Sequence, residues 1–523
     1  MTARRPPGAG SRTTLAGSWR GVLALAAGAG TVFGFAPFGL SALPVVTLAL
    51  LFALWQAAAS AGAVAAAGFA FGLGLFGAGA SWVYIALNTF GGMPAPAAVL
   101  ATAGFCAYLA LFPALAGWLA ARWTAPRAWP RVLAAAGAWT LAEWARGWVL
   151  SGFGWLALGY AQLPDGGATW FAGYAPVGGV YLVTFVTALG AAALALAVDA
   201  CAAIGSRRGA VLLAAIAALA IVGDALGKIE WTRPAGEPVA VSLVQGNVAQ
   251  DLKFDPDFRR NTFVLYTDLI AQSRGRLVVL PESAFPVFAD EVPDPVLLGI
   301  FRMASARDGD VLVGMFTAEP PLPGRDDLRY YNSVIALGAS ELQLYRKRHL
   351  VPFGETIPLD FVLAPLLRAI LAIPLASQTP GNADQPALNV AGQRVAVNIC
   401  YEDAFGADIR PQAAAATMLV NVTNDAWYGR SLAAEQHNQI AAMRALEAGR
   451  PMLRATNTGI TSAIGHDGRV FARLPWFTRN ILEVEVTGRQ GTTPYVRFGD
   501  ALPAGLAAAL LVAAVAAARR VTP

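Results

Sequence analysis

The chain has 523 residues, of which 56% are hydrophobic and only 14% are charged, with a formal net charge of +5. Soluble globular chains carry about 25% charged residues, so this composition excludes an ordinary soluble protein and indicates an integral membrane protein with one soluble domain. The positive charge does not indicate nucleic-acid binding, because the arginines gather at the ends of apolar segments, where they set membrane topology.

The first part of the chain predicts a bundle of membrane-spanning helices. No charged residue occurs between Arg20 and Arg122, a length that accommodates about four spans of roughly 20 residues each. Proline and glycine breaks, followed by arginine-rich turns, place seven spans at 20–37, 42–59, 61–85, 96–121, 131–149, 177–199 and 209–226. A last apolar run at 502–518 predicts an eighth span. We expect no cleaved signal peptide, because the apolar character simply continues.

Two features of this part stand out from the apolar background. Glu143 and Arg146 lie within the fifth predicted span, where they could pair one turn apart or sit near the interface. The segment Gly152–Gln162 is amphipathic and aromatic, which favours a re-entrant or interfacial segment.

The character of the chain changes between about 236 and 495, where β-branched runs alternate with amphipathic helical patterns. This alternation predicts one α/β domain. The chain therefore divides into a membrane domain (1–235), an α/β domain (236–497) and a C-terminal span with its tail (498–523). Helices are predicted at 256–274, 294–307 and 432–448. Strands are predicted at Val239–Gln245, Leu277–Leu280, Val311–Phe316, Ser333–Leu337, Leu342–Tyr345, Val395–Ile399, Met418–Val422 and Leu453–Thr456.

The apolar stretch Phe361–Leu375 within this domain is either a core helix or a lid or arm that touches the bilayer. The positions of the arginines predict which side of the membrane the domain occupies. The N-terminus, the turns at 122–131 and 207–208 and the tail at 519–520 are arginine-rich, whereas the alternate turns are not. We therefore expect both termini in the cytoplasm and the α/β domain on the periplasmic side of a bacterial inner membrane.

Cys400 is the candidate nucleophile. It ends the apolar strand Val395–Ile399, and it is the only one of three cysteines outside an apolar, membrane-like segment. Three cysteines do not make a disulfide framework. A thiol at the end of a buried strand is either a small buried hydrophobe or, with a base or cation beside it, a nucleophile.

Three charged side chains could activate this thiol. Glu282 directly follows the apolar strand and proline of Leu277–Pro281, where it is either a strand-end carboxylate or a general base. Lys347 is one of only three lysines, with Lys228 and Lys253, and it is either part of a basic surface run or an ammonium for a developing oxyanion. Glu355 could orient Lys347 or the substrate.

His349 is a rival for the role of base, because cysteine–histidine pairs are common in hydrolases. His437 and His466 show no metal-ligand spacing, and the chain has no CxxC, HExxH or P-loop motif. We therefore expect no metal and no cofactor.

These motifs together resemble the Glu–Lys–Cys triad of the nitrilase, or carbon–nitrogen hydrolase, superfamily. The matching residues are Leu-Pro-Glu282, Tyr345-x-Lys347 with Leu-Val-Pro-Phe-Gly-Glu355, Cys400-Tyr401-Glu402, Val244-Gln-Gly-Asn247, Tyr331-Asn-Ser333 and Asn421-Val-Thr-Asn-Asp-Ala-Trp-Tyr-Gly429. Seven predicted spans before the domain and one after it resemble the apolipoprotein N-acyltransferase family in particular. The resemblance covers essentially the whole chain.

The resemblance implies an αββα sandwich and a ping-pong acyl transfer. Cys400 would take the sn-1 acyl chain of a phospholipid, typically phosphatidylethanolamine, and pass it to the amine of the diacylglyceryl-cysteine of an apolipoprotein. The protein would act as a monomer at the bilayer without nucleic acid. The resemblance makes Glu282 the base, Lys347 the oxyanion partner, and Glu355, Tyr401 and Glu402 supporting residues. The nominated substrate-binding residues are Phe254, Phe353, Asn424 and Trp427.

One position departs from the family, which tends to have tryptophan where this chain has Phe254. Phenylalanine keeps an aromatic face but lacks an N–H donor, so a role that depends on an indole hydrogen bond is in doubt here.

Two other functions remain open on the sequence. A membrane-bound amidase would use the same triad with water as the acceptor, but it does not explain eight spans. A transporter with a binding domain would need charged residues at membrane depth, and the first four predicted spans have none.

Overall fold

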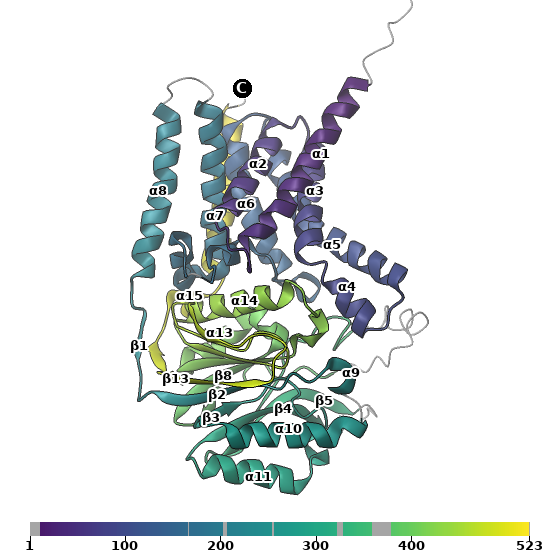
Figure 1. Cartoon of the computed structure of the whole chain (residues 1–523). Coiled ribbons are helices and arrows are strands. Elements are labelled where there is room, and N and C mark those ends of the chain that lie inside the picture. The colour runs from purple at the N-terminus through teal and green to yellow at the C-terminus, as the bar shows by residue number, and fades with distance from the viewer. Residues whose placement is uncertain are drawn as a thin grey trace, which may run out of the picture.

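The computed structural model describes residues 11–165, 167–201, 207–253, 256–321, 328–357 and 378–521. They form a helical bundle and, below it, a domain of two packed sheets (Figure 1). The bundle's helices are α1 (Ser11–Thr31), α2 (Leu43–Ala57), α3 (Ala61–Gly79), α4 (Val83–Ile85), α5 (Ala95–Arg122), α6 (Trp129–Arg146), α7 (Ala175–Cys201), α8 (Arg207–Gly227) and α16 (Ala501–Val521). Helical turns η1 to η5 connect them at Val32–Gly34, Ala86–Phe90, Val149–Ser151, Leu158–Gln162 and Trp170–Tyr174.

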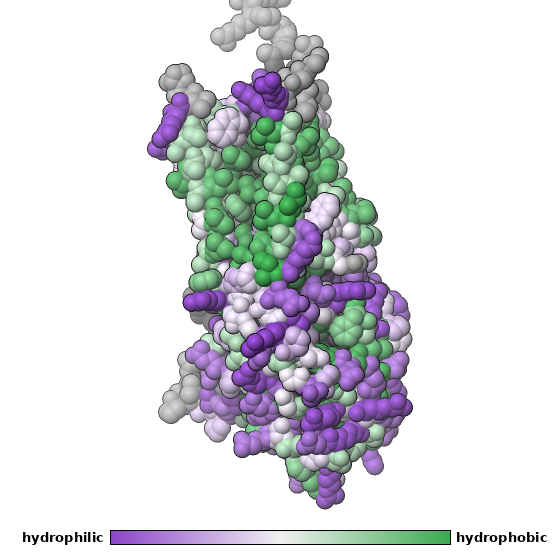
Figure 2. Space-filling view, turned by 90° about the vertical axis from the view of Figure 1, so that its left-hand side faces the viewer, coloured by the Kyte–Doolittle hydropathy of each residue, from purple (hydrophilic) through white to green (hydrophobic). Residues whose placement is uncertain are grey.

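Among the described residues, five helical segments are long and apolar enough to cross a membrane. They are Ala61–Gly79, Ala95–Arg122, Trp170–Ala200, Arg207–Gly227 and Ala501–Arg520. Helices α1, α2 and α6 also lie where spans are predicted, but they do not meet the same length and composition criteria. Eight crossings therefore remain a prediction. On the face that Figure 2 shows, the surface of the bundle is mostly apolar and that of the sheet domain is largely hydrophilic.

Small residues let the helices of the bundle approach closely. A Cβ atom at Gly28 of α1 would collide with the backbone of Phe71 in α3, and one at Gly72 of α3 would collide with Ala110 in α5. Such close backbone contact is how helices pack in lipid, where the hydrophobic effect between apolar helices is weak. Glycine at these positions therefore fixes the α1–α3–α5 group on one side of the bundle.

The α/β domain contains two six-stranded sheets and a short two-stranded one. The first sheet has the order β13-β2-β3-β4-β5-β6, the second the order β12-β11-β10-β9-β8-β7, and β1 pairs with β14. Strands β2, β3 and β4 are parallel, and so are β8, β9 and β10. Consequently the carboxyl ends of the central strands in each sheet lie at one edge.

The strands are β1 (Thr232–Pro234), β2 (Val239–Gln245), β3 (Leu277–Val279), β4 (Asp310–Glu319), β5 (Arg329–Gly338), β6 (Gln343–Arg346), β7 (Leu388–Val390), β8 (Gln393–Ile399), β9 (Met418–Thr423), β10 (Met452–Thr456), β11 (Ser462–Ile464), β12 (Val470–Arg473), β13 (Asn480–Val486) and β14 (Arg489–Gly491). The helices are α9 (Gln250–Lys253), α10 (Arg259–Gln272), α11 (Asp294–Ser305), α13 (Gly406–Ala415), α14 (Ala433–Ala448) and α15 (Pro494–Phe498). Helical turns η6 to η9 cover Pro256–Phe258, Ala289–Glu291, Cys400–Ala404 and Asp425–Tyr428.

These elements make four layers (Figure 1). Helices α10 and α11 cover the outer face of the first sheet, and α13 and α14 lie between the second sheet and the bundle. All residues of α14 except Glu435 are buried, although seven of its sixteen residues are polar or charged. The helix must therefore satisfy its polar side chains against both the sheet and the bundle.

Hydrogen bonds from α14 join the two parts of the molecule. Gln436 accepts a hydrogen bond from the indole of Trp82 at 3.2 Å, and Gln439 accepts one from the backbone of Ala36 at 3.1 Å. Glu447 accepts one from the backbone N–H of Val180 at 2.7 Å. The α/β domain is thus fixed against the membrane helices by a buried polar interface.

Two predictions fall outside the described residues. They are the arm or core helix at Phe361–Leu375 and the substrate-binding role of Phe254.

Candidate active site

Cys400 lies at the carboxyl end of β8, as the sequence predicts. Strand β8 lies inside its sheet between β7 and β9, which gives the residue that follows it a rigid support. The backbone of Cys400 has a φ of 54°, in the left-handed region that non-glycine residues rarely adopt. Such strained backbone is concentrated at functional sites, where surrounding contacts hold it. The side chain is buried, with 6% of its surface exposed.

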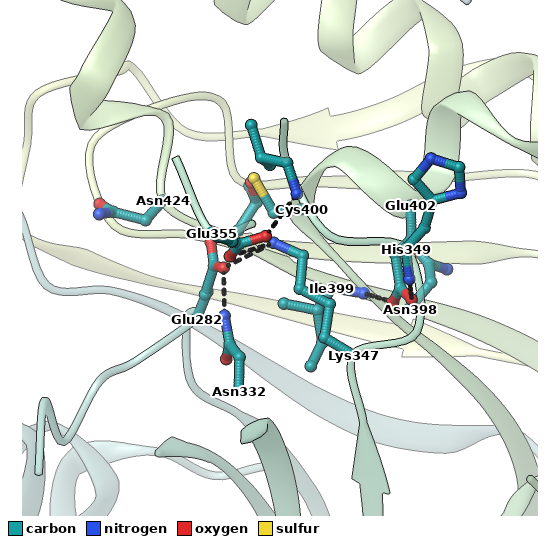
Figure 3. Close-up of polar contacts among 12 residues, drawn as sticks. Glu282, Asn332, Lys347, His349, Glu355, Asn398, Ile399, Cys400, Glu402 and Asn424 are labelled. Atoms are coloured by element: carbon teal, nitrogen blue, oxygen red, sulfur yellow. Dashed lines mark hydrogen bonds and ion pairs between the residues drawn. The ribbon is translucent and has the colours of Figure 1, made fainter. Parts of the chain in front are cut away.

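Glu282 and Lys347 reach the same place from the facing sheet (Figure 3). Glu282 follows β3 and Lys347 follows β6. The Lys347 Nζ lies 3.3 Å from a carboxylate oxygen of Glu282 and 2.7 Å from one of Glu355. The carboxamide of Asn332 on β5 donates to the same Glu282 oxygen at 2.7 Å. The structure therefore brings the three predicted catalytic side chains and Glu355 together between the sheets.

The charges in this cluster act strongly on one another. Burial and the negative charge of Glu282 raise the pKa of the Cys400 thiol, and the Lys347 ammonium only partly offsets them. Burial alone would raise the pKa of Glu282, but Lys347, Lys253 and the Asn332 hydrogen bond outweigh it and lower that pKa. Burial would lower the pKa of Lys347, yet the two carboxylates hold it well above its usual value. The resting site is a neutral thiol beside an ionised carboxylate and an ammonium, so a proton must move before the sulfur can attack.

Lys253 is a second ammonium at this site, which the sequence analysis counted but assigned no role. Its Nζ donates to the backbone carbonyl of Glu282 at 2.9 Å, and only 3% of the residue is exposed. Burial lowers its pKa to about 8, although the negative charges of Glu282 and Cys400 oppose the shift. The rarity of lysine in this chain was the signal that could have identified it.

Glu402 organises the turn beside the nucleophile. Its carboxylate accepts hydrogen bonds from the Tyr345 hydroxyl at 3.0 Å and from the backbone N–H groups of Arg348, His349 and Ile399 at 2.7, 3.0 and 2.7 Å. Burial raises the pKa of Glu402 in spite of these donors. Because it binds residues of both sheets, Glu402 fixes the Lys347 loop against the Cys400 turn.

Tyr401 connects the nucleophile to the membrane domain. Its hydroxyl donates to the carbonyl of Gly152 at 2.8 Å, and its ring stacks on Trp155 with centroids 5.6 Å apart. The stretch Gly152–Gln162, predicted to be re-entrant or interfacial, is a buried segment that packs directly against the nucleophile turn.

Two charged residues near the end of α6, Glu143 and Arg146, hold this segment in place. Glu143 accepts hydrogen bonds from the backbone of Leu158 at 3.1 Å and from Thr184 at 2.9 Å. Arg146 donates to the carbonyls of Phe153 and Trp155, both at 2.6 Å. Their role is therefore to bind the Gly152–Gln162 segment, which was not predicted from the sequence.

His349 is engaged elsewhere. Its Nδ1 lies 2.9 Å from Asp408, its Nε2 lies 2.8 Å from the Ser151 carbonyl, and its ring stacks on Phe405. Both ring nitrogens thus have partners outside the Cys400, Glu282 and Lys347 cluster, which favours Glu282 over His349 as the base.

The nominated substrate-binding residues fall into two groups. Phe353 and Trp427 are exposed, at 57% and 38%, and Trp427 packs edge-on against Phe90 of the bundle. Asn424 is buried and shares hydrogen bonds with Gln250 at 2.7 Å and Asn457 at 2.9 Å. The aromatic pair can therefore meet an apolar chain, whereas Asn424 supports the segment that carries Lys253.

Among the described residues no group of three or more histidine, cysteine or acidic side chains has the geometry of a metal site. A thiol, a carboxylate and an ammonium between two sheets can perform acyl transfer through a covalent intermediate.

Comparisons with known proteins agree with this chemistry. Residues 240–495 match the carbon–nitrogen hydrolase family, and residues 27–193 match the N-terminal domain of apolipoprotein N-acyltransferase. An apolipoprotein N-acyltransferase of Nitrosomonas europaea is 47% identical over 96% of this chain and 98% of its own length. Those of Chromobacterium violaceum and Methylococcus capsulatus are each 43% identical, over 94% and 95% of this chain and 93% and 96% of theirs.

Fold and site together define a membrane-embedded acyltransferase built on a carbon–nitrogen hydrolase domain. With full-length relatives at this identity, the chain belongs to the apolipoprotein N-acyltransferase family.

Proposed function

We propose that this enzyme transfers the sn-1 acyl chain of a phospholipid, with phosphatidylethanolamine as the natural donor, to the amine of the diacylglyceryl-cysteine of apolipoproteins. The reaction proceeds in two steps through a thioester on Cys400, and it completes lipoprotein maturation. The observation that carries the proposal is the convergence of the Cys400 thiol with the paired Glu282 and Lys347, in a chain whose relatives are named for N-acylation of apolipoproteins.

In the first step Glu282 takes the thiol proton and the sulfur attacks the ester carbonyl of the donor. The Lys347 ammonium faces the oxyanion of the tetrahedral intermediate. Collapse breaks the ester C–O bond, and the leaving lysophospholipid oxygen receives the proton from Glu282. The products are a thioester on Cys400 and a free lysophospholipid.

In the second step the acceptor amine attacks the thioester carbonyl and Glu282 takes the proton that the amine loses. Collapse breaks the C–S bond and forms the amide. The sulfur leaves as a thiolate, which the same ammonium stabilises and which recovers its proton from Glu282. One site thus serves both steps, with the acyl chain held in between.

The arrangement of the chain suits substrates that stay in a bilayer. We place the domain 236–497 on the periplasmic side of a bacterial inner membrane, with seven spans before it, one after it, and both termini in the cytoplasm. The enzyme acts as a monomer, and the exposed rings of Phe353 and Trp427 contact the acyl chains. The contact between the bundle and the turn after Cys400 supports a site at the membrane surface, because it brings the nucleophile close to the lipid phase.

Mass spectrometry of the purified protein tests the proposal. After incubation with phosphatidylethanolamine vesicles, the peptide that carries Cys400 should gain one acyl chain that hydroxylamine removes. Addition of a diacylated lipopeptide should discharge the adduct with formation of an amide. Cys400→Ala and Lys347→Ala should form no adduct, whereas Lys228→Ala, a change at an exposed lysine, should behave as wild type. Hydrolysis of small amides without an adduct would support the rival amidase function instead.

A further inference from the structure

The carbonyl group of Cys400 is held from behind by a buried histidine. The Nε2 of His437 on α14 lies 3.2 Å from the Cys400 carbonyl oxygen and 2.9 Å from an oxygen of Asp403. Its Nδ1 lies 2.8 Å from an oxygen of Asp425. His437 is completely buried.

The partners of His437 determine its charge state. Each ring nitrogen faces only oxygen acceptors, two from aspartates and one from a backbone carbonyl. A neutral imidazole has one donor and one acceptor nitrogen, so either tautomer would turn a lone pair toward a carboxylate. Only the imidazolium donates at both positions. The nearby carboxylates of Asp403 and Asp425 outweigh burial and the charge of Arg454, and they raise the pKa of His437 to about 9.

Arg454 on β10 closes these residues into a ring. It donates to Asp403 at 2.9 Å and to Asp425 at 3.0 Å, on the carboxylate oxygens opposite those that contact His437. Two cations and two anions therefore alternate, with no net charge. All four side chains are at most 2% exposed, and they come from four separate elements: η8, η9, α14 and β10. Removing a single member of such a ring would leave an uncompensated buried charge, which is strongly destabilising.

The ring has a second connection to the nucleophile. Asn421 donates to the Cys400 carbonyl at 3.1 Å, and its own side-chain oxygen accepts from Arg454 at 2.9 Å. Two donors, His437 and Asn421, thus hold one carbonyl of a residue whose φ of 54° is unfavourable. The indole of Trp155 packs on the imidazole of His437, with centroids 5.1 Å apart. Trp155 thereby covers the imidazole from the membrane side.

We propose that His437 is a positioning residue for the nucleophile. Its imidazolium fixes the Cys400 carbonyl, and with it the strained turn that directs the sulfur, and it balances the aspartates next to the thiol. The role deepens the proposed function and rests on it, because it concerns the nucleophile of that reaction.

The balance of charge has a measurable consequence. The Asp425 carboxylate already raises the pKa of the Cys400 thiol. Replacing His437 by a neutral residue would leave two carboxylates against the single charge of Arg454, so the thiol would face one more uncompensated negative charge. Its thiolate would then be harder to form. A residue with only a packing role would not change the ionisation of the thiol.

Three variants separate charge from packing. His437→Gln keeps a donor amide but removes the charge. The double variant His437→Gln/Asp425→Asn removes one cation and one anion, so the buried group is neutral again and is expected to fold. Asn438→Ala is the matched control: Asn438 is the next residue of α14, is equally buried, and accepts a hydrogen bond from Ser462 at 2.7 Å.

The first readout is the rate at which iodoacetamide alkylates the Cys400 peptide as a function of pH, in the full-length protein in detergent. His437→Gln should shift this profile by about one pH unit to higher pH, the double variant should return it toward wild type, and Asn438→Ala should leave it unchanged. An unshifted profile for His437→Gln overturns the proposal, and so does an equal shift for Asn438→Ala.

The second readout is the rate of thioester formation with phosphatidylethanolamine vesicles. His437→Gln should slow it about tenfold at constant donor KM, because the sulfur is less often ionised and correctly directed. Wild-type rates in both His437 variants would overturn the positioning role.

The third readout uses the wild-type protein and does not depend on whether a variant folds. The chain has three histidines, so ¹⁵N-histidine spectra are simple. One imidazole should remain doubly protonated at about pH 8, where an ordinary histidine is neutral, and its signal should be missing in the double variant. Three neutral histidines at that pH overturn the proposal.

Alkylation and the histidine spectra need no lipid. Failure of wild type to form the acyl adduct, with both of these as expected, would reject the proposed function and leave the positioning role in place. If wild type forms the acyl adduct but the pH shift or the imidazolium signal is missing, the positioning role is rejected and the proposed function stands.

Discussion

Trp155 of the membrane domain stacks on Tyr401, the residue after the nucleophile, with ring planes 15° apart and centroids separated by 5.6 Å. Trp155 is completely buried, and its backbone carbonyl accepts a hydrogen bond from Arg146 of α6. The membrane helices therefore do more than hold the enzyme at the bilayer. They support one face of the turn that carries Cys400.

Substituting this tryptophan should impair catalysis without releasing the protein from the membrane. Trp155→Leu removes a stacked aromatic pair, whose loss is worth up to about 1.5 kcal/mol, so the rate of thioester formation should fall by about tenfold. Trp148→Leu is the control, because Trp148 lies seven residues earlier and is 56% exposed. Membrane fractionation and the acylation rate measure the two effects. An unchanged acylation rate in Trp155→Leu would show that the bundle serves only as an anchor.

Asn332 should control the ionisation of the base. Its side chain donates to Glu282 at 2.7 Å, while its backbone carbonyl accepts from the N–H of Lys347 at 2.8 Å. The hydrogen bond lowers the pKa of Glu282, so Asn332→Ala should raise that pKa. Since Glu282 must be ionised to take the thiol proton, the acidic limb of the pH–rate profile should move to higher pH.

The matched control is Ser333→Ala. Ser333 is the next residue of β5, on the opposite face of the strand, where it shares a hydrogen bond with Thr317 at 2.8 Å. Its pH–rate profile should coincide with that of wild type. Coincident acidic limbs in Asn332→Ala and wild type would mean that Glu282 does not act as the base.

The sequence predicts the central strands of both sheets and the edge strand β6, but it misses the other edge strands and the shortest strands. Runs such as Val395–Ile399 and Met418–Val422 are apolar because they are buried on both faces, and both are strands in the structure. Strand β13 (Asn480–Val486) was missed, because its alternation of polar and apolar residues is interrupted and it pairs with β2, more than 200 residues away in the sequence. Short strands such as β7 and β14 have too few residues to form a pattern.

In the active site, too, local sequence pattern predicts some residues and not others. Cys400, Glu282 and Lys347 each end or follow a strand and carry a recognisable motif, so their convergence could be anticipated. Asn332 and His437 could not be assigned from local pattern, because their partners lie 50 and 37 residues away, at Glu282 and Cys400. Their function exists only once the two sheets and α14 are packed.

Lys253 should contribute to activity at a cost in stability. Its ammonium is buried. It donates to the backbone carbonyl of Glu282 at 2.9 Å, and not to the carboxylate of that residue. Burial lowers the pKa of this ammonium from 10.5 to about 8, so at neutral pH the charged side chain destabilises the folded state. Lys253→Met should therefore melt at a higher temperature than wild type.

The same change should slow acylation at neutral pH. The positive charge of Lys253 lowers the pKa of Glu282, so its loss leaves less of the base ionised. Lys228→Met is the control, because Lys228 is exposed at the end of α8 and pairs there with Asp224. Thermal denaturation in detergent and the acylation rate test both effects. A variant that is less stable than wild type, or fully active, contradicts this account of Lys253.

The buried imidazolium should make stability depend on pH. Folding raises the pKa of His437 from its usual 6.5 to about 9, so the folded state binds this proton more tightly than the unfolded state. The contribution is complete below about pH 6.5 and is lost as the pH rises through about 9, and a shift of this size corresponds to a free energy on the order of 3 kcal/mol. Lys253 acts in the opposite sense. Its pKa is lowered from 10.5 to about 8, so its penalty is complete below about pH 8 and diminishes between about pH 8 and pH 10.5.

Comparing variants across pH separates the two groups. In a Lys253→Met background the melting temperature should fall steeply between about pH 7 and pH 9, because only the loss of the His437 proton remains. In His437→Gln/Asp425→Asn the fall over this interval should be absent, and stability should instead rise slightly above about pH 8 as Lys253 loses its proton. Identical pH profiles for the two variants would show that neither group titrates in the folded protein as the structure indicates.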